Sequence, residues 1–587
     1  MIKAVPPALI FILGALLIPL LKGKSKQVYL LLIPAVAFMD LLHLEPGTSW
    51  VYQFLGYKLI FCQVDRLSLV VGYIFVIIGF LAILYALHIQ EDGQHIAAFL
   101  YVGSSLGVVF AGDYFSLFAF WEIMAVASVF LIWFQKEKDS LNAGFRYILM
   151  HIFGGCCLLA GIIIYTVSKG SIDVVLMEPS HAYWLILIGF GLNTAFIPIH
   201  TWLPDAYPEG TITGSVFLSV FTTKTGVYVL ARCFPGVEFV AYMGGVMAVY
   251  GVIFALLQNN ARRLLAYHIV SQVGYMVAGV GVGTAQGVNG GIAHVFNHIL
   301  YKALLFMCMG SVMYMTGRRK LTDMGGLAKF MPITCITFII AALSISGAPG
   351  FNGFVSKGMV IASAVESHMP ILELMLILAS VGTFLSFVKL GYFCFFARNY
   401  EIESKEAPFN MQLAMGLTAF ACVFIGLYPK ILFDILPYNV VDYNPFTPSH
   451  IIGVIQLFML AGLAFIIAKA MVVPHRATIL DFDYFYRMGG RGLIWVCTIP
   501  MSKFRSTLQV RFSRAVYVIA RLARNPISIL EILTAYVYLR ITKGLRYVSG
   551  YSSGETYDED LYRRPIGVGV LIAIIFLFVF ALVYFIF

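Results

Sequence analysis

Long apolar segments follow one another along almost the whole chain, and short polar stretches separate them. A transmembrane α-helix needs about 20 apolar residues, at 1.5 Å each, to cross roughly 30 Å of hydrocarbon. About sixteen segments meet this requirement. They are predicted at residues 4–21, 27–44, 67–90, 96–112, 114–134, 141–167, 182–203, 211–232, 238–258, 264–283, 288–316, 331–367, 371–397, 409–428, 450–471 and 565–587. The pattern therefore predicts an all-α, polytopic membrane protein.

The segment at 331–367 is too long for one straight helix across a membrane. It contains the stretch SISGAPGFNGF, in which proline removes a helical hydrogen bond and glycine loosens the backbone. We expect the helix to be interrupted there, in the middle of the membrane.

The composition of the chain agrees with a membrane protein. Of the 587 residues, 60% are hydrophobic and 12% are charged, whereas an ordinary soluble chain has about 45–50% and 25%. A secreted disulfide scaffold, a cytosolic enzyme and a nucleic-acid binder are therefore excluded. The apolar run from Ala4 to Leu21 has no small-residue cleavage site before the basic KGKSK, so we predict a first span and not a cleaved signal peptide.

The nine cysteines lie mostly inside apolar runs, and none belongs to a CxxC pair. Iron–sulfur clusters and zinc ribbons use such close spacing to bring thiolates to one centre. We therefore expect no metal centre and no cofactor in this chain.

Basic residues stand in alternate loops between the predicted spans. They are Lys22, Lys24 and Lys26, then Lys136 and Lys138, then Arg262 and Arg263, and then Arg318, Arg319 and Lys320. Short loops rich in Lys and Arg stay on the cytoplasmic side of a membrane. This rule places both termini on the outer side, and we predict a multi-pass protein of a bacterial or archaeal inner membrane.

A strongly basic segment follows the fifteenth span, from Lys503 to Arg546. It holds nine Lys and Arg residues against one acid, Glu531, and so supplies eight of the ten net positive charges. Its apolar residues recur at three- and four-residue steps, which predicts a basic amphipathic helix along the cytoplasmic surface, kinked at Asn525–Pro526. Two interpretations stay open: a surface helix held by acidic lipid, or a strap across neighbouring helices or subunits that the span at 565–587 anchors.

Two ionisable residues, Glu122 and Lys224, lie near the middle of their predicted spans. A charge near the centre of a bilayer costs several kcal/mol, so such a residue is a functional candidate by default. One interpretation is a static ion pair that joins two helices. The other is a titrating pair, in which the carboxylate keeps the lysine charged until the two separate.

The segment HVFNHILYK places His294, His298 and Lys302 at positions i, i+4 and i+8, so all three share one helix face. Two histidines at this spacing can bind zinc, or haem when a second pair faces them, but the chain has no third acidic or thiol ligand nearby and no second HxxxH. They can also be ordinary core residues. Two imidazoles and an amine in a row inside a membrane suit a proton relay, because imidazole donates from one nitrogen while it accepts at the other.

Two further lysines occur at membrane depth. Lys357 follows the interrupted stretch, and interrupted helices in a membrane line protein or a water-filled cavity, so we expect Lys357 to face a cavity. Lys389, in SFVKLGYFCFFAR, is placed within its span much as Lys224 is within TKTGVYVLAR, which suggests an internal structural repeat.

Six motifs in a fixed order give the chain a family resemblance over about residues 60 to 400. They are LFAFWE, FIPIHTWLPDAYPEGTITGSV, RRLLAYHIVSQVGYM, HVFNHILYKALLF, LTDMGGLAKFMPIT and SGAPGFNGFVSK. These runs resemble the antiporter-type proton-translocating subunits of respiratory complex I, membrane-bound hydrogenases and Mrp-type sodium/proton antiporters. The later stretches NMQLAMG, LPYNVVDY and LDFDYFYR look more like D-type Mrp-related subunits.

The resemblance implies two inverted five-helix repeats, each with a broken helix, that form the ion path. It also implies that the basic amphipathic helix and terminal span are the lateral helix and anchor of a distal subunit. The spans and the resemblance together divide the chain into N-terminal transmembrane helices (1–95), a first half-channel repeat (96–233), a second half-channel repeat (234–400), additional transmembrane helices (401–480), the lateral helix (481–564) and a terminal anchor (565–587).

Where the motifs match, each functional residue of the family corresponds to one residue of this chain. The glutamate of the fifth span falls on Glu122, the lysine of the eighth on Lys224, the histidine–lysine cluster on His294, His298 and Lys302, and the terminal lysine or glutamate on Lys357. One position departs, because the family usually has a lysine where this chain has Asn193. Asparagine cannot take up a proton. Either Lys224 pairs directly with Glu122, or the first half-channel is altered.

These residues predict a subunit that moves protons through a row of buried Lys, His and Glu side chains, within a complex of other membrane subunits. Lysines suit proton carriage, and no carboxylate cluster for Na⁺ is evident, although exchange of H⁺ for Na⁺ stays open. The energy source is also open: redox chemistry, hydrogen evolution or an ion gradient. The alternatives are a non-conducting anchor for a redox or hydrogenase module, a self-sufficient secondary transporter, and a cytochrome-type electron carrier.

Overall fold

The structure is a computed structural model, and it describes residues 5–397, 402–438, 443–467, 473–474, 479–524, 533–534, 536–538, 541, 570–571 and 573–577. The chain divides into two compact units, residues 1–485 and residues 486–587. Helices make up most of the described residues, which confirms the predicted class.

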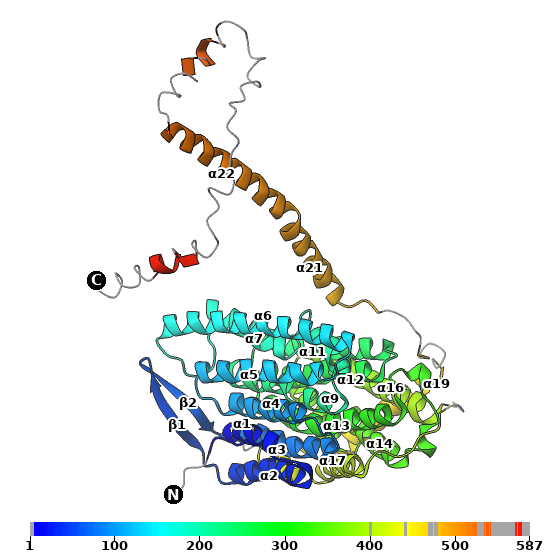
Figure 1. Cartoon of the computed structure of the whole chain (residues 1–587). Coiled ribbons are helices and arrows are strands. Elements are labelled where there is room, and N and C mark those ends of the chain that lie inside the picture. The colour runs from blue at the N-terminus through cyan, green and yellow to red at the C-terminus, as the bar shows by residue number, and fades with distance from the viewer. Residues whose placement is uncertain are drawn as a thin grey trace. The chain divides into compact units, whose positions relative to one another are not determined.

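The long helices of the first unit run side by side across the view of Figure 1. In chain order its first elements are α1 (Pro7–Leu17), α2 (Gly23–Leu42), β1 (Gly47–Phe54), β2 (Tyr57–Val64), α3 (Arg66–Ala86), α4 (Asp92–Phe110), α5 (Tyr114–Trp133), α6 (Lys138–Lys169), α7 (His181–Asn193), α8 (Trp202–Ala206), α9 (Ile212–Leu218) and α10 (Thr222–Cys233). The next are α11 (Glu238–Leu257), α12 (Ala261–Val282), α13 (Ala285–Thr316), α14 (Pro332–Ser346), α15 (Asn352–Glu366), α16 (Pro370–Gly391), α17 (Phe409–Leu427), α18 (Lys430–Phe433) and α19 (Pro448–Ile467).

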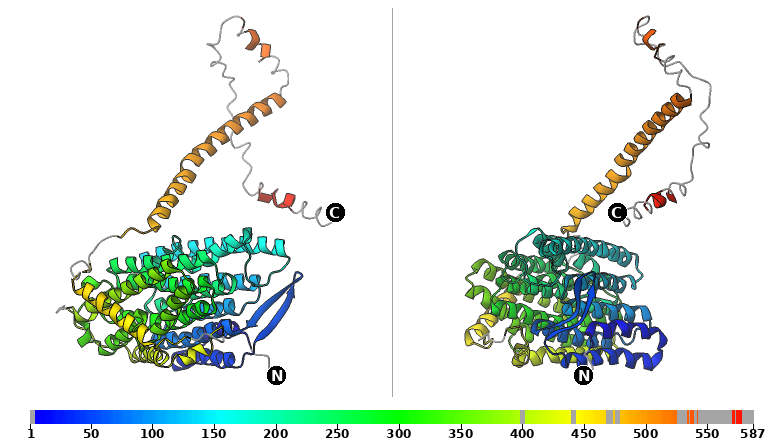
Figure 2. Two further views of the ribbon diagram at one scale, coloured as in Figure 1. Left: turned by 180° about the vertical axis from the view of Figure 1, so that it is seen from behind. Right: turned by 90° about the vertical axis from the view of Figure 1, so that its left-hand side faces the viewer.

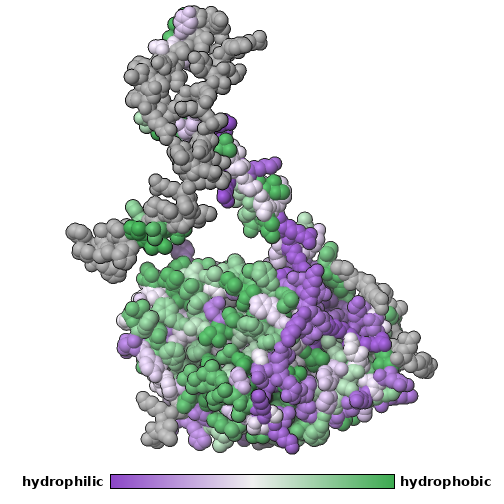
Figure 3. Space-filling view, in the orientation of Figure 1, coloured by the Kyte–Doolittle hydropathy of each residue, from purple (hydrophilic) through white to green (hydrophobic). Residues whose placement is uncertain are grey.

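Twelve helical segments among the described residues are long and apolar enough to cross a membrane, and the shorter helical segments Pro7–Leu20 and Pro332–Ser346 are also apolar. Figure 3 shows hydrophobic side chains over much of the first unit, with hydrophilic side chains gathered toward the right of the view. The predicted polytopic membrane fold is therefore confirmed. The predicted span at 565–587 lies mostly outside the described residues.

A β-hairpin stands between the second and third helices, where no strand was predicted. Its register pairs Gly47 with Val64 and Phe54 with Tyr57. The turn residues Leu55 and Gly56 both have positive φ, which is the backbone of the tight turns that match the twist of a two-stranded ribbon. Both views in Figure 2 place the hairpin at the end of the bundle where α1 begins.

Three predicted spans are interrupted. The break expected within 331–367 is present: α14 ends at Ser346, and Gly347, with φ of +84°, turns the chain away before α15. The spans predicted at 182–203 and 211–232 are also divided: α7 ends at Asn193, and α9 and α10 are separate helices within Ile212–Cys233, which as a whole is long and apolar enough to cross a membrane. Apolar composition alone does not reveal breaks that buried side chains stabilise.

Two helices follow, α21 (Asp483–Thr498) and α22 (Pro500–Arg524), and the second contains the start of the basic segment. The prediction of a helix from Lys503 is thus confirmed as far as Arg524. The predicted kink at Asn525–Pro526 lies outside the described residues.

Candidate functional site

Three lysines lie deep in the first unit: Lys224 on α10, Lys302 on α13 and Lys357 on α15. Their exposed fractions are 0, 0 and 4%. None of the three pairs with a carboxylate in the part of the chain that the structure describes. A buried ammonium group without a counter-ion destabilises a fold, so these side chains require a functional explanation.

The second cluster, defined as His294, His298, Lys302 and Lys357, is built mainly on α13. Thr284 caps the start of this helix with its side chain. From there α13 continues unbroken for 32 residues. The predicted spacing therefore places both histidines and Lys302 on one face, and all three are fully buried.

Hydrogen bonds join one end of this row to α15. The Ser356 hydroxyl lies 3.0 Å from His294 Nδ1, and the Tyr301 hydroxyl lies 3.3 Å from His294 Nε2. His298 makes no hydrogen bond to any described residue, and its ring centre lies 6.2 Å from that of His294. The gap between the two imidazoles is short enough for one bridging water molecule.

Aromatic rings surround the amine of Lys302. Its Nζ lies 6.0 Å from the ring centres of both Phe306 and Phe387, and within the described chain it has no hydrogen-bond partner. Ring faces attract a cation, so they favour the charged amine without holding its protons. On α12, the buried imidazole of His268 packs against Phe387 with ring centres 4.8 Å apart.

Lys357 lies one turn beyond the break between α14 and α15. Its Nζ lies 5.0 Å from the ring centre of Tyr275, which lies 5.6 Å from that of His294. Lys302 and His294 are eight residues apart on α13, which is about 12 Å along the helix. The two histidines therefore extend from Lys302 to the neighbourhood of Lys357. The structure thus brings the four predicted residues of the second cluster into one buried row.

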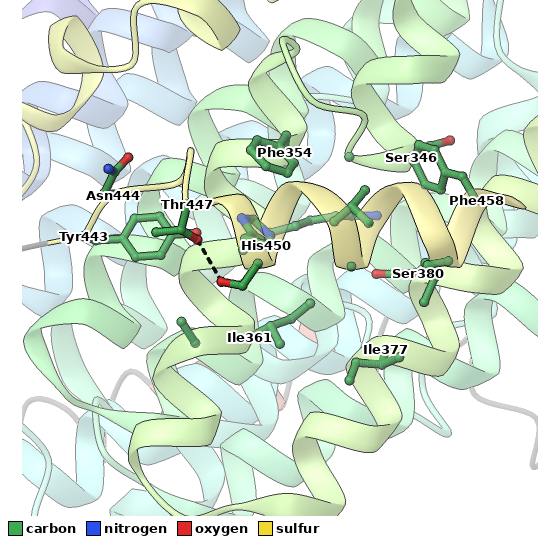
Figure 4. Close-up of a pocket in the computed structure, with 18 residues that line it drawn as sticks. Ser346, Phe354, Ile361, Ile377, Ser380, Tyr443, Asn444, Thr447, His450 and Phe458 are labelled. Carbon is green, nitrogen blue, oxygen red and sulfur yellow. Dashed lines mark hydrogen bonds between the residues drawn. The ribbon is translucent and has the colours of Figure 1, made fainter. Parts of the chain in front are cut away.

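A cavity of about 590 Å³ adjoins Lys357 (Figure 4). It lies among α15, α16, α19 and the segment before α19, so the prediction that Lys357 lines a cavity agrees with the geometry. Polar and aromatic groups share its wall: Ser346, Phe354, Lys357, Ser380, Tyr443, Thr447, Ser449 and His450. Thr447 and Ser449 are joined by a hydrogen bond of 3.5 Å, the dashed line of Figure 4.

His450 faces the same cavity from α19. Its ring stacks on Phe354 at 4.3 Å, and its Nδ1 donates to the Pro445 carbonyl at 2.8 Å. That bond leaves Nε2 of a neutral ring free to accept a proton. Gly358 permits the close approach, because a Cβ there would lie 2.4 Å from the imidazole.

The first cluster, defined as Glu122, His151, Asn193 and Lys224, draws each residue from a different helix. Asp113 starts α5 by accepting from two backbone amides at 2.8 and 2.9 Å, and Glu122 follows about two turns later. The Glu122 side chain is half-buried, and its buried Oε1 finds no hydrogen-bond donor among the described residues.

Lys224 lies in the first turn of α10, just after the break that follows α9. Its Nζ donates to the Ser219 carbonyl at 2.5 Å, which would otherwise be left open where α9 ends. It forms no ion pair with Glu122 within the described residues, so the direct pair considered from sequence is absent. Lys224 is close enough to His298 and Lys302 for their charges to interact, which connects the two clusters.

Asn193 ends α7 and is 1% exposed. His151 on α6 lies beside it, within interaction distance of its carboxamide. Neither the amide nor the imidazole makes a hydrogen bond of ordinary geometry to a described residue. His151 packs against the rings of Tyr147 and Trp202, with ring centres 4.2 and 4.7 Å away, and these two rings also contact each other.

A buried carboxylate, Asp481, follows α19. It accepts hydrogen bonds from the hydroxyls of Tyr250 and Tyr267, each at 2.5 Å, and lies 3.4 Å from His200 Nε2. Burial by itself would raise the pKa of Asp481, but His200 and the two hydroxyls outweigh it and lower the pKa to about 2. Asp481 therefore joins the loop after α7 to α11 and α12.

Lys389 stands apart from both clusters. Its Nζ donates to the carbonyls of Leu256 and Gln258, at 2.6 and 3.1 Å, where α11 ends. An amine at this position satisfies carbonyls that have no partner within their own helix. These contacts describe a helix cap and do not join Lys389 to the row.

The sequence did not single out four buried or half-buried histidines near the clusters: His151, His200, His268 and His450. The rule that polar residues at membrane depth are functional applies to histidine as well as to charged residues, and it would have found the first three. Among the described residues, no group of three or more His, Cys, Asp or Glu side chains could hold a metal ion.

Comparisons with known proteins bear on this arrangement. The family described as NADH:quinone oxidoreductase/Mrp antiporter, TM, matches residues 111–386. An uncharacterized protein of Methanocaldococcus jannaschii is 30% identical over 57% of this chain and 74% of its own length. The Na(+)/H(+) antiporter subunit A1 of Staphylococcus haemolyticus is 28% identical over 71% of this chain and 60% of its own length.

Among solved structures, a chain of the membrane-bound sulfane sulfur reductase, an archaeal respiratory membrane complex, is similar in fold. The TM-score is 0.68 at 23% identity, over 91% of this chain and 99% of that one. The likeness extends the shared helical architecture well beyond the residues that the family matches.

Proposed function

This chain belongs to the NADH:quinone oxidoreductase/Mrp antiporter family of membrane proteins, and we propose that it moves protons across a prokaryotic membrane as one subunit of a larger complex. One observation carries the proposal: the unpaired lysines Lys302 and Lys357 lie at the two ends of a buried row that contains His298 and His294. Amines and imidazoles in such a row exchange protons with one another and with intervening water.

Protons pass along the second cluster between Lys302 and Lys357. Each amine binds a proton when water reaches it and releases it to the neighbouring imidazole when the charge nearby changes. The cavity beside Lys357 adjoins the loop between α17 and α19, which the alternation of basic loops assigns to the outer side. It supplies the outer access of the pathway.

Glu122 couples this movement to a partner. Its side chain is half-buried at the edge of the bundle, beside the exposed apolar residues Ile123 and Val126. A charge on an adjacent subunit can therefore draw the carboxylate outward. Lys224 and the second cluster then lose a negative charge that favours their protonated forms, and a proton is released.

The ion carried by this chain is H⁺. Sodium requires several oxygen ligands, whereas the two clusters offer amines, imidazoles, one carboxylate and one carboxamide. The Staphylococcus relative bears the name of a Na(+)/H(+) antiporter subunit, which supports exchange for Na⁺ as a second candidate, with the sodium site on another subunit.

The complex isolated from its native membrane and reconstituted into vesicles tests this function. We expect Lys302→Ala and Lys357→Ala to assemble normally and to abolish proton movement, measured with an internal pH-sensitive dye. Assembled variants that still move protons at the wild-type rate would instead favour the non-conducting anchor. Proteins that copurify identify the energy source: iron–sulfur or flavin subunits indicate redox coupling, and small membrane subunits alone indicate antiport.

A further inference from the structure

We propose that His151 carries the proton between Glu122 and Lys224, at the place where Asn193 interrupts the row of titratable groups. This inference rests on the proposed function. It gives the first cluster a complete pathway of its own: carboxylate, imidazole, amine.

The burial and bonding of His151 require an explanation. The residue is 2% exposed, and neither ring nitrogen makes a hydrogen bond of ordinary geometry to a described residue, although the Asn193 carboxamide lies within interaction distance. A structural core histidine usually has well-formed hydrogen bonds, because an unsatisfied buried polar group destabilises the fold. His151 therefore resembles the buried, unpaired groups of the second cluster more than an ordinary core histidine.

On one side, His151 neighbours Glu122. The Glu122 carboxylate lies against the backbone of Gly155, so closely that a Cβ there would stand 2.2 Å from Oε1. Gly155 is four residues after His151 on α6, which is about one helical turn and places both on the same face. The Glu122 carboxylate, which comes from α5, and the His151 imidazole therefore lie about one turn apart along the same face of α6.

On the other side, His151 approaches the helix of Lys224 through Asn193. The imidazole lies beside the Asn193 carboxamide. Gly226, two residues after Lys224, packs so closely on the end of α7 that a Cβ there would lie 2.7 Å from Thr194 Cγ2 and 3.2 Å from the Asn193 carbonyl carbon. This contact brings helix α10 next to Asn193. The Lys224 amine, two residues away and bonded to the Ser219 carbonyl, points to another face of α10, so water completes the step from His151 to Lys224.

The chemistry of the transfer is balanced in two steps. A protonated Glu122 gives its proton to the imidazole, which leaves a carboxylate and an imidazolium. The imidazolium then gives the proton on its other nitrogen to the neutral Lys224 amine, which leaves imidazole and ammonium. Asn193 cannot be protonated, but its carboxamide can accept from the ring or from a water beside it.

Two aromatic rings pack against His151 and suit this role. Tyr147 and Trp202 contact the imidazole and also each other, with their ring centres 5.5 Å apart, and the Trp202 Nε1 donates to the Leu192 carbonyl at 3.0 Å. Trp202 is thereby fixed next to Asn193. These contacts hold the imidazole beside the Asn193 carboxamide.

A substitution and its rescue test the proposal in the intact reconstituted complex. We expect His151→Gln, which keeps the size and polarity of the side chain, to slow proton uptake by about tenfold or more. Adding Asn193→Lys to that variant places an amine in the same gap and restores most of the rate. His181→Gln, at the exposed start of α7, is the matched control and leaves the rate unchanged.

Two results would overturn the inference: a wild-type rate in assembled His151→Gln, or a slow rate that Asn193→Lys does not restore. The second result would assign His151 to packing between Tyr147 and Trp202. The Lys302→Ala variant separates this outcome from failure of the proposed function. If Lys302→Ala abolishes proton uptake while His151→Gln does not, only the role of His151 is rejected.

Discussion

The two clusters differ in how many helices supply their groups and in how deeply those groups are buried. In the second cluster, three of the four groups stand on one unbroken helix and are fully buried. In the first cluster, each group comes from a different helix, an amide stands in the row, and the carboxylate is half-exposed at the edge of the bundle. Under the proposed function, this difference suits the second cluster to pass protons within the chain and the first cluster to respond to a neighbour.

The positions of the groups depend on different forces in the two clusters. Helical periodicity alone aligns His294, His298 and Lys302. The first cluster instead depends on glycines that allow close packing, at Gly155 beside Glu122 and at Gly226 beside Asn193. Substitutions should therefore separate the clusters by the kind of change that each tolerates.

The largest effect is expected from Lys302→Arg in the second cluster. Arginine keeps the positive charge but cannot release a proton, so we expect proton uptake by reconstituted vesicles to fall about 100-fold. Lys329→Arg, at an exposed position, is the control. Uptake by Lys302→Arg at half the wild-type rate or more would show that Lys302 acts only as a fixed charge.

A smaller effect is expected from Gly155→Ala in the first cluster. The new methyl group would overlap Glu122 Oε1 and displace the carboxylate from the face that it shares with His151. Because proton transfer depends steeply on distance, we expect uptake to fall about tenfold. Gly154→Ala contacts Leu192 instead and should remain near the wild-type rate.

Asp481 joins the loop after α7 to α11 and α12 and belongs to neither cluster, so its loss should affect stability and not distinguish the clusters. Its pKa of about 2 lies below the usual value near 4. A lowered pKa stabilises the fold above about pH 4, and this contribution is lost as the pH falls toward 2.

We therefore expect Asp481→Asn to lower the unfolding temperature at pH 7 by about 2 °C, and the difference from wild type to disappear near pH 2. Tryptophan fluorescence of the detergent-solubilised complex measures both values. Asp434→Asn, at an exposed position, is the control. A constant difference across this pH range would contradict the assigned pKa.

The smallest effect is expected from Lys389→Gln. The Lys389 amine caps the end of α11 and lies outside both clusters. We expect proton uptake within about twofold of wild type and a slightly lower unfolding temperature, since one or two hydrogen bonds are weakened. A loss of uptake as large as that of Lys302→Arg would restore Lys389 to the pathway predicted from sequence.

Much of the second cluster could be predicted from sequence because a single helix contains its spacing. In the first cluster, Glu122, Lys224 and Asn193 were also singled out from sequence, but His151 was not, since its adjacency to Asn193 depends on how α6 packs against α7. Apolar content similarly predicted the spans but not the hairpin, whose strands lie in a segment of mixed polarity between α2 and α3. His450 was missed because only the packing of α19 on α15 brings it near Lys357.

The rings around Lys302 and Lys357 have a consequence for the resting membrane. Phe306, Phe387 and Tyr275 can favour an ammonium ion, yet a phenylalanine ring cannot take up its proton. The rings thus separate each lysine from the next proton carrier. Under the proposed function, such a pathway is insulating until water enters it, and the protein can sit in an energised membrane without discharging it.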